Sequence, residues 1–161
     1  MAKAKQLNAL AGIKMNFSTL GIRTGLKDYE LAYWLNIHYG LNLVCREKPI
    51  DTWEEKAVWE YNVFDGTDTN GEPLCMVMNI SSGAQLDEEA GWSLFESTPE
   101  KHLLPSVKHW DYLIMTENSD FAFDLEYALK RNEKITTAQY FEAHTKLTTQ
   151  ETHLLYEIRN I

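Results

Sequence analysis

Histidines, cysteines and glycines could do chemistry in this sequence, but their spacing does not match the common catalytic or metal-binding motifs. The five histidines lie far apart, at His38, His102, His109, His144 and His153. A metal site needs at least three converging ligands, and the chain has no HExxH motif and no cysteine pair at metal spacing. A phosphate-binding loop and a nucleophile elbow are also absent. The sequence therefore predicts no metal, no cofactor and no catalytic residue, and it favours a protein that is not an enzyme.

The loop GTDTNG carries acidic and amide side chains that superficially resemble a calcium site. If Asp68 and Asn70 are placed at the third and fifth ligand positions, Gly66 falls at the first and Val77 at the twelfth. An EF-hand needs carboxylates at those two positions. The spacing therefore argues against calcium.

A more informative carboxylate is Asp111, in the stretch LLPSVKHWDYLIM. Aspartate is disfavoured inside strands, and with period two Asp111 shares a face with Leu113 and Met115, so it needs a partner. Pro105 suits the first position of a helical turn, which has unpaired backbone N–H groups. We expect Asp111 to be structural, accepting hydrogen bonds from N–H groups around Pro105 and Ser106. A catalytic or ligand-binding role is the alternative.

Aromatic residues are abundant and recur along the chain. The set comprises Tyr33, Trp34, Tyr39, Trp53, Trp59, Tyr61, Trp92 and Trp110. Packing in the core and at its rim is the ordinary role of such residues, because they bury large areas while keeping a polar tip wet. The alternative is a pocket or a partner surface lined with rings.

Length and charge limit the possible classes of protein. The chain has 161 residues, enough for one domain with a hydrophobic core. Fifteen Lys and Arg against 24 Asp and Glu give a net charge of −9, which disfavours a nucleic-acid partner. No stretch has the apolar length of a membrane span or the pattern of a signal peptide. These features predict a cytoplasmic protein that binds neither nucleic acid nor membrane.

The two cysteines, Cys45 and Cys75, each fall inside a predicted strand. Buried, reduced thiols that pack as small hydrophobic groups are the usual case in a cytosol. We expect that state for both, and a disulfide between them is the alternative.

Periodicity predicts the order of secondary structure. In KDYELAYWLNIHYG, helical spacing joins Leu31, Trp34, Leu35 and His38, and Gly40 is suited to end the helix. The predicted strands are KMNFSTLGIRTGL, LNLVCRE, AVWEYNVFD, EPLCMVMNI, WDYLIMT and ITTAQYFEA, with WSLF as a short extra strand. Further helices are predicted near FAFDLEYALKRN and in LTTQETHLLYEIRNI.

This order, β-α-β-β-β, a long connection and β-α-β-α, predicts an α+β fold. We expect a mixed, mostly antiparallel sheet of about six strands, with two or three helices mainly on one face. The first two strands are candidates for a parallel arrangement around the first helix. Residues 1–161 form a single predicted domain, with 1–13 as a frayed arm. Residues 148–161 form a docked C-terminal helix that opens with a capping box between Thr148 and Glu151.

The stretch around Asp111 resembles the motif of the IPExxxVDY family, a group of uncharacterised proteins from Bacteroidetes. The matching positions are Leu104 in place of the motif's Ile, Pro105, Asp111 and Tyr112. Ser106 departs from the motif's Glu and Trp110 from its Val. KDYELAYWLN and ETHLLYE also resemble family segments. The resemblance implies a bacterial cytoplasmic protein and no established activity. Because a serine cannot replace a carboxylate in proton transfer, Ser106 argues against catalysis at the motif.

Two functional hypotheses follow. The first is a non-enzymatic interaction module capable of forming a homo-oligomer. The alternative is a small-molecule-binding protein or an enzyme with an aromatic-lined pocket between the first helix, the aromatic residues and the long connection. The candidate ligand-binding or motif residues are Pro105, Asp111, Tyr112, Trp34 and Trp110.

Overall fold

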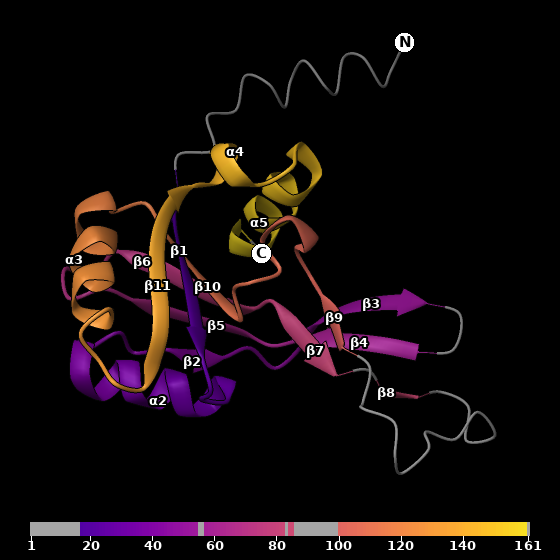
Figure 1. Cartoon of the computed structure of the whole chain (residues 1–161), viewed down its shortest axis with the longest axis horizontal. Helices are drawn as coiled ribbons and strands as arrows, with labels where there is room; N and C mark the ends of the chain where they lie inside the picture. Colours follow the sequence, from indigo (N-terminus) through magenta and orange to yellow (C-terminus); the bar gives the residue numbers. More distant parts are fainter. Residues whose placement is uncertain (1–16, 55–56, 83, 86–99, 161) are drawn as a thin grey trace.

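The computed structural model describes residues 17–54, 57–82, 84–85 and 100–160 (Figure 1). Its strands are β1 (Ser18–Thr24), β2 (Val44–Cys45), β3 (Ile50–Glu54), β4 (Ala57–Tyr61), β5 (Val63–Thr67), β6 (Pro73–Met78), β7 (Ile80–Ser82), β8 (Ala84–Gln85), β9 (Glu100–His102), β10 (Tyr112–Thr116) and β11 (Ile135–Glu142). Its helices are α2 (Asp28–Tyr39), α3 (Ser119–Leu129), α4 (Ala143–Lys146) and α5 (Thr149–Asn160), with a 3₁₀ turn η2 (Pro105–Val107). The predicted arm 1–13 and the predicted strand WSLF lie outside the described residues.

The main sheet has six strands in the order β11-β1-β10-β6-β5-β2, and every neighbouring pair is antiparallel. The predicted α+β fold is therefore confirmed. Because the strand directions alternate, β1 and β2 run parallel, as predicted for the first two strands. They are not neighbours, since three strands lie between them. The N-terminal strand β1 instead lies between β10 and β11, which come from the C-terminal third of the chain.

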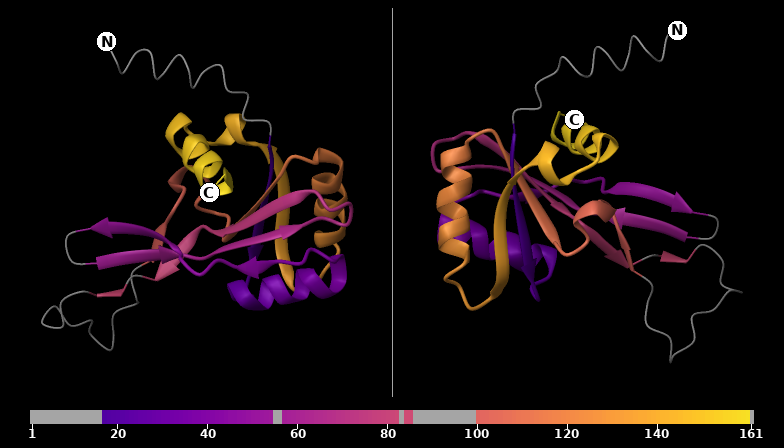
Figure 2. Two further views of the ribbon diagram at one scale, coloured as in Figure 1. Left: turned by 180° about the vertical axis from the view of Figure 1, so that it is seen from behind. Right: turned by 45° about the horizontal axis from the view of Figure 1, so that its top comes forward.

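Two smaller sheets, β3-β4-β8 and β7-β9, extend beyond one end of the main sheet (Figure 2). The single strand predicted over AVWEYNVFD was wrong, because the chain changes sheet at Asn62 and divides the stretch into β4 and β5. Asn79 separates β6 from β7 at the corresponding place, and the Met78 N–H donates to the Asn62 carbonyl, 3.1 Å away. Strand β3 was not predicted, and the predicted strand LNLVCRE is only two residues long.

Each face of the main sheet carries its own apolar layer, as strand β10 shows. Tyr112 and Ile114 belong to a buried cluster shared with α2 and α3. Leu113 and Met115 point into the opposite cluster, which α5 and the η2 turn cover. The chain thus has two hydrophobic layers with the sheet between them. No helix in the described part of the chain is long and apolar enough to cross a membrane.

Helix α2 forms as its spacing predicts. Leu31, Trp34 and Leu35 are buried against the sheet. The helix ends at Gly40, whose φ of 65° is the left-handed conformation that glycine adopts without steric cost.

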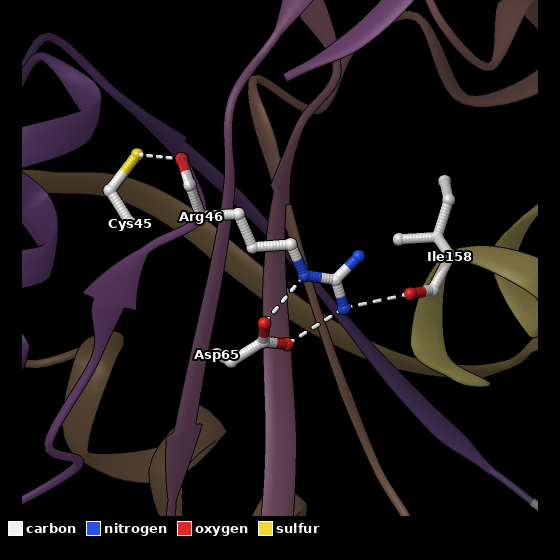
Figure 3. A network of polar contacts seen from close by, with 4 residues as sticks. All are labelled: Cys45, Arg46, Asp65 and Ile158. Atoms are coloured by element: carbon white, nitrogen blue, oxygen red, sulfur yellow. Dashed lines mark hydrogen bonds and ion pairs between the residues drawn. The ribbon is translucent and has the colours of Figure 1, made fainter. Parts of the chain in front are cut away.

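Helix α5 is fixed to the other face at both ends. The predicted capping box is confirmed: the Thr148 N–H donates to the Glu151 carboxylate at 2.8 Å, and the Glu151 N–H donates to the Thr148 hydroxyl at 3.2 Å. Near the other end, the Arg46 guanidinium donates to the Ile158 carbonyl at 2.8 Å and to both carboxylate oxygens of Asp65, at 2.5 and 2.8 Å (Figure 3). A cation at a helix C-terminus is favoured by the helix dipole. Arg46 thus joins α5 to the outer strands of the sheet.

The packing on β1 predicts the effect of one glycine substitution. A Cβ atom added to Gly21 would lie 2.5 Å from Trp110 Cδ2, whereas a Cβ on Gly25 would meet no atom within 4 Å. Because Trp110 is buried, we expect Gly21→Ala to lower the free energy of unfolding by about 1–3 kcal/mol through overpacking. Gly25→Ala is the matched control and should be neutral or slightly stabilising. Denaturant melts measure both, and equal midpoints for the two variants would contradict this packing.

Candidate functional site

The motif-like stretch is a turn that leads into β10, with Pro105 and Ser106 exposed and its apolar side chains buried. Leu104, Val107 and Trp110 are almost fully buried in the layer beneath α5. Pro105 opens the η2 turn, at the position where its missing N–H costs nothing. Ordinary packing therefore accounts for the apolar part of the motif.

The fully buried side chain of Asn79 holds this turn in place. Its amide nitrogen donates to the carbonyls of Val107, at 3.1 Å, and Trp110, at 2.9 Å. Its amide oxygen accepts from the Leu104 N–H at 2.8 Å. The Asn79 backbone also bonds the stretch at both ends, donating to the Asp111 carbonyl and accepting from the Leu103 N–H. One asparagine therefore supplies hydrogen bonds that the backbone of a paired strand would otherwise have made to this stretch. Sequence reasoning missed it, because a single Asn in an apolar run is also typical of a turn.

Asp111 binds the last residue of β1, and Tyr112 binds the connection between β1 and α2. The Asp111 carboxylate accepts from the Thr24 N–H at 3.0 Å, and the Tyr112 hydroxyl donates to the Leu26 carbonyl at 2.8 Å. Burial, followed by the nearby acidic charges of Asp28, Asp111 and Glu30, raises the pKa of Tyr112. The hydroxyl therefore stays protonated and keeps donating.

The hydrogen-bond donors predicted for Asp111 were wrong. The residue before β10 runs beside β1, since the Asp111 N–H donates to the Ile22 carbonyl. The register between β1 and β11 shifts between Arg23 and Thr24, and Asp111 takes the N–H of Thr24 at this irregularity. The carboxylate thus meets the backbone of a neighbouring strand, not that of its own turn.

The N–H of Ser106 is taken by a carboxylate from α5. Glu151 Oε1 accepts it at 3.0 Å while Oε2 serves the capping box at Thr148. Burial acts to raise the pKa of Glu151, but the hydrogen bonds from Ser106 and Thr148 outweigh it and leave the pKa below its usual value. The motif-like turn and α5 are therefore joined through one ionised side chain. Its part in the capping box was visible in the sequence, but its bond to Ser106 was not.

The five predicted site residues do not form one site. Trp110 belongs to the layer beneath α5, whereas Pro105 is exposed at the start of the η2 turn. Trp34 lies in the opposite layer, where its ring contacts those of His38 and Tyr39. Of the aromatic set, Trp59, Tyr61 and Trp110 thus belong to one buried layer and Trp34 and Tyr39 to the other. Trp53 is exposed on β3, and Trp92 lies outside the described residues.

The loop that superficially resembles a calcium site is tied by Asp68. This buried carboxylate accepts from the N–H groups of Asn70 and Glu72 and from the amide of Asn118, at 2.8 to 3.2 Å. Its oxygens are therefore used within the protein. In the described ranges, no group of three His, Cys, Asp or Glu side chains is placed to hold a metal ion.

The cysteines differ from one another. Cys75 is buried, and this burial raises the pKa of its thiol to about 12, so the thiolate needed for nucleophilic attack is scarce. Cys45 is exposed, and the expectation that it would be buried was wrong because β2 is the edge strand. Both are free thiols in the structure.

The outer face of α2 is apolar as well. Tyr29, Tyr33 and Ile37 are 57, 68 and 58% exposed, at positions i, i+4 and i+8 of the helix. This spacing places the three on one side of the helix, away from Leu31 and Leu35. The helix therefore presents an uncovered apolar face to solvent. We call these three residues the α2 stripe.

Two hollows of similar size lie beside α3. One, of 450 Å³, lies where the start of α3 meets the ends of β1 and β11 and the start of α4. The other, of 440 Å³, lies between the end of α2 and α3, beside Tyr39 and Phe121. Neither is lined by tryptophan.

No family model matches this chain, and neither does any curated protein or solved structure.

Removing the Asn79 amide should destabilise the protein strongly. Asn79→Leu leaves the Trp110 carbonyl and the Leu104 N–H without partners, while the Val107 carbonyl keeps only the Trp110 N–H, and each unsatisfied group costs about 1–3 kcal/mol. We expect a loss of several kcal/mol in the free energy of unfolding, measured by urea denaturation. Asn62→Leu, at the other sheet change, is the control. Its side chain makes one bond, to Asp28, and the loss should be smaller.

The lowered pKa of Glu151 predicts a pH dependence of stability. A carboxyl group with a depressed pKa in the folded state stabilises the protein above its unfolded pKa of about 4.3. This contribution is lost as pH falls through the folded pKa. Glu151→Gln should therefore be less stable than the parent at neutral pH by about 1–3 kcal/mol. The difference should shrink as the pH falls below 4.

Thermal melts of the two proteins from neutral to acidic pH measure this effect. Glu157→Gln, on the exposed side of α5, serves as the control and should melt like the parent at neutral pH. A constant difference between Glu151→Gln and the parent at all pH values would contradict the proposed contribution of the ionised carboxylate.

Proposed function

We propose that this chain is a non-enzymatic interaction module that self-associates through the α2 stripe. The observation that carries the proposal is the uncovered apolar face formed by Tyr29, Tyr33 and Ile37. A surface helix of a protein without a partner normally places charged and polar residues on this side. Exposed apolar side chains that are contiguous typically mark an interaction surface.

The residue types in the stripe support a protein partner. Tyrosine is enriched in interface cores, where its ring is buried and its hydroxyl finds a partner at the rim. Tyr29 and Tyr33 are held on a helix whose other face is anchored in the core, so their backbone is already ordered before binding. Preorganisation lowers the entropic cost of association.

The α2 stripe is complementary to a second copy of itself. Tyr33 lies at its centre, with Tyr29 and Ile37 four residues to either side. A two-fold axis beside Tyr33 therefore pairs the two helices antiparallel and sets Tyr29 of one copy near Ile37 of the other. This arrangement places the acidic first turns, with Asp28 and Glu30, at opposite ends of the interface.

Area and charge predict that this association is weak. A helix of 12 residues is about 18 Å long, and one helix pair covers less than the ~800 Å² per partner of a standard stable interface. Each copy also carries a charge of −9, so the copies repel one another at long range. Salt screens this repulsion and should strengthen the dimer.

A bacterial cytoplasmic setting and a relationship to the IPExxxVDY family belong to this proposal. They are supported by the resemblance at Leu104, Pro105, Asp111 and Tyr112. The packing roles of these residues agree with a non-enzymatic protein, because their polar groups are engaged in bonds to the protein's own backbone. The acidic charge supports the absence of a nucleic-acid partner.

Sedimentation velocity tests the self-association. We expect the sedimentation coefficient of the full chain to rise with protein concentration, and to rise further when salt is added. Tyr33→Glu buries a charge at the two-fold axis and should leave a monomer at the same concentrations. Tyr127→Glu, at a tyrosine of α3 that is 60% exposed, is the matched control and should still associate. A parent protein that stays monomeric throughout, or equal behaviour of the two variants, would overturn the proposal.

A further inference from the structure

The 450 Å³ hollow at the start of α3 has walls that fit one kind of ligand. Its position and its residues are separate from the α2 stripe. One wall is aromatic: the rings of Phe123 and Tyr140 lie 4.2 Å apart, centroid to centroid, at an interplanar angle of 34°. Phe123 is 49% exposed although it has no polar atom to keep in water. An aromatic face is thus open to the hollow.

The tyrosine of this wall is held in place. Its hydroxyl lies 3.3 Å from the Ser18 hydroxyl on β1, and its backbone N–H is bound by the Glu126 carboxylate from α3. Ring and backbone are therefore fixed by two different elements. A fixed ring lowers the entropic cost of stacking a ligand against it.

The remaining walls carry negative charge. Glu117 and Glu142 line the hollow with side chains 61 and 58% exposed, and the lining contains no Lys or Arg. Arg159 lies 2.7 Å from Oε1 of Glu117, and the His144 ring lies 3.3 Å from Oε2 of Glu142. Both carboxylates are more than half exposed at the hollow, so solvent and a ligand can reach them. The overall charge of −9 adds to the local potential, which attracts cations.

These walls together select an organic cation. An aromatic face attracts a positive group through its quadrupole, and a carboxylate binds that group directly. An anion is repelled by both glutamates, and a metal ion would find too few ligands, because no group of three His, Cys, Asp or Glu in the described ranges is placed to hold one. A guanidinium suits the walls better than an ammonium, because it stacks flat on a ring and bonds a carboxylate with its edge.

Arginines of the protein itself make both kinds of contact, stacking on a ring and binding a carboxylate, at two separate places. Arg131 places its guanidinium 4.1 Å from the ring centroid of Tyr127 on α3, and Arg159 binds Glu117. We propose that the hollow between α3, β11 and α4 binds a guanidinium group. The group stacks on the ring of Phe123 or Tyr140 and its edge bonds Glu142. A volume of 450 Å³ lies within the ~300–1,000 Å³ typical of small-ligand sites.

The source of this guanidinium is either a free small molecule or an arginine side chain of a peptide, since the head group is the same. Two probes distinguish them. One is n-butylguanidinium, and the other is the blocked tripeptide acetyl-Gly-Arg-Gly-amide. Tighter binding of the tripeptide assigns the site to peptide arginine, and equal binding assigns it to the head group alone. The neutral isostere n-butylurea controls for shape.

The test is a titration of the isotope-labelled full chain, followed by the amide resonances in two-dimensional NMR spectra. We expect saturable shifts at Ser18, Ser119, Phe123, Tyr140 and His144 with both guanidinium probes, and none with n-butylurea. Such localised shifts would place the ligand in the hollow.

Variants separate the carboxylate from the ring. Glu142→Gln should weaken binding about tenfold or more, the effect of losing a charged hydrogen-bond partner. Phe123→Leu keeps an apolar side chain but removes the ring, and should weaken binding about threefold. Glu60→Gln, an exposed glutamate of β4, changes the net charge equally and should bind like the parent.

This test is independent of the proposed self-association. Tyr33→Glu, which should prevent self-association, should still bind the guanidinium probes like the parent protein. Shifts that never saturate, that spread over the whole surface, or that appear equally with n-butylurea would overturn the site. Binding that is unchanged in Glu142→Gln would overturn it as well.

Discussion

The buried amide of Asn79 is the interaction on which the rest of this structure depends. At the point where the chain leaves β6, one side chain satisfies two carbonyls and one N–H of the turn before β10. The buried backbone groups of this turn need such partners, because leaving them unpaired costs several kcal/mol together. With the turn fixed, Trp110 lies against Gly21, Asp111 binds the end of β1, and Tyr112 binds the connection between β1 and α2.

Helix α5 also holds the turn before β10 in place. Glu151 bonds its own first turn and the N–H of Ser106, so the helix and the turn position one another. Ser106 is where the chain departs from the Glu of the family motif that it resembles. A glutamate side chain at this position would bring a second carboxylate close to Glu151, and like charges in a partly buried site repel. The departure at Ser106 is therefore compatible with the neighbour that this chain provides.

Local patterns predicted the elements well, because their causes are local. The spacing of Leu31, Trp34 and Leu35 and the stop at Gly40 describe α2, and the pair Thr148 and Glu151 describes the start of α5. The division at Asn62 was not predictable, because an apolar run looks the same whether it serves one sheet or two. The partner of Asp111 was missed because it depends on which strand lies alongside, and strand order is a tertiary property. The exposure of the α2 stripe was not predicted. Aromatic residues on a helix are typical of both a core and an interface, so their presence did not show which side of α2 faces solvent.

The exposed and the buried surfaces of α2 thus have different origins. Its inner face packs against the sheet, so a substitution there changes the stability of the fold. Its outer face has no counterpart within the described part of the chain, and neither does the aromatic wall at Phe123. Both features lie on regular elements held by the core, which keeps their side chains in fixed relative positions.

The place of β1 between β10 and β11 governs how this chain can acquire its structure. Contacts of β1 span 87 residues from Thr24 to Asp111 and 122 residues from Ser18 to Tyr140. During synthesis the first strand therefore leaves the ribosome long before either neighbour exists, and its apolar residues Leu20 and Ile22 must wait for them. Closing loops of this length before any contact is gained makes folding slow. An unpaired strand that stays exposed during this interval favours aggregation, and β1 can pair only after β10 and β11 have been made.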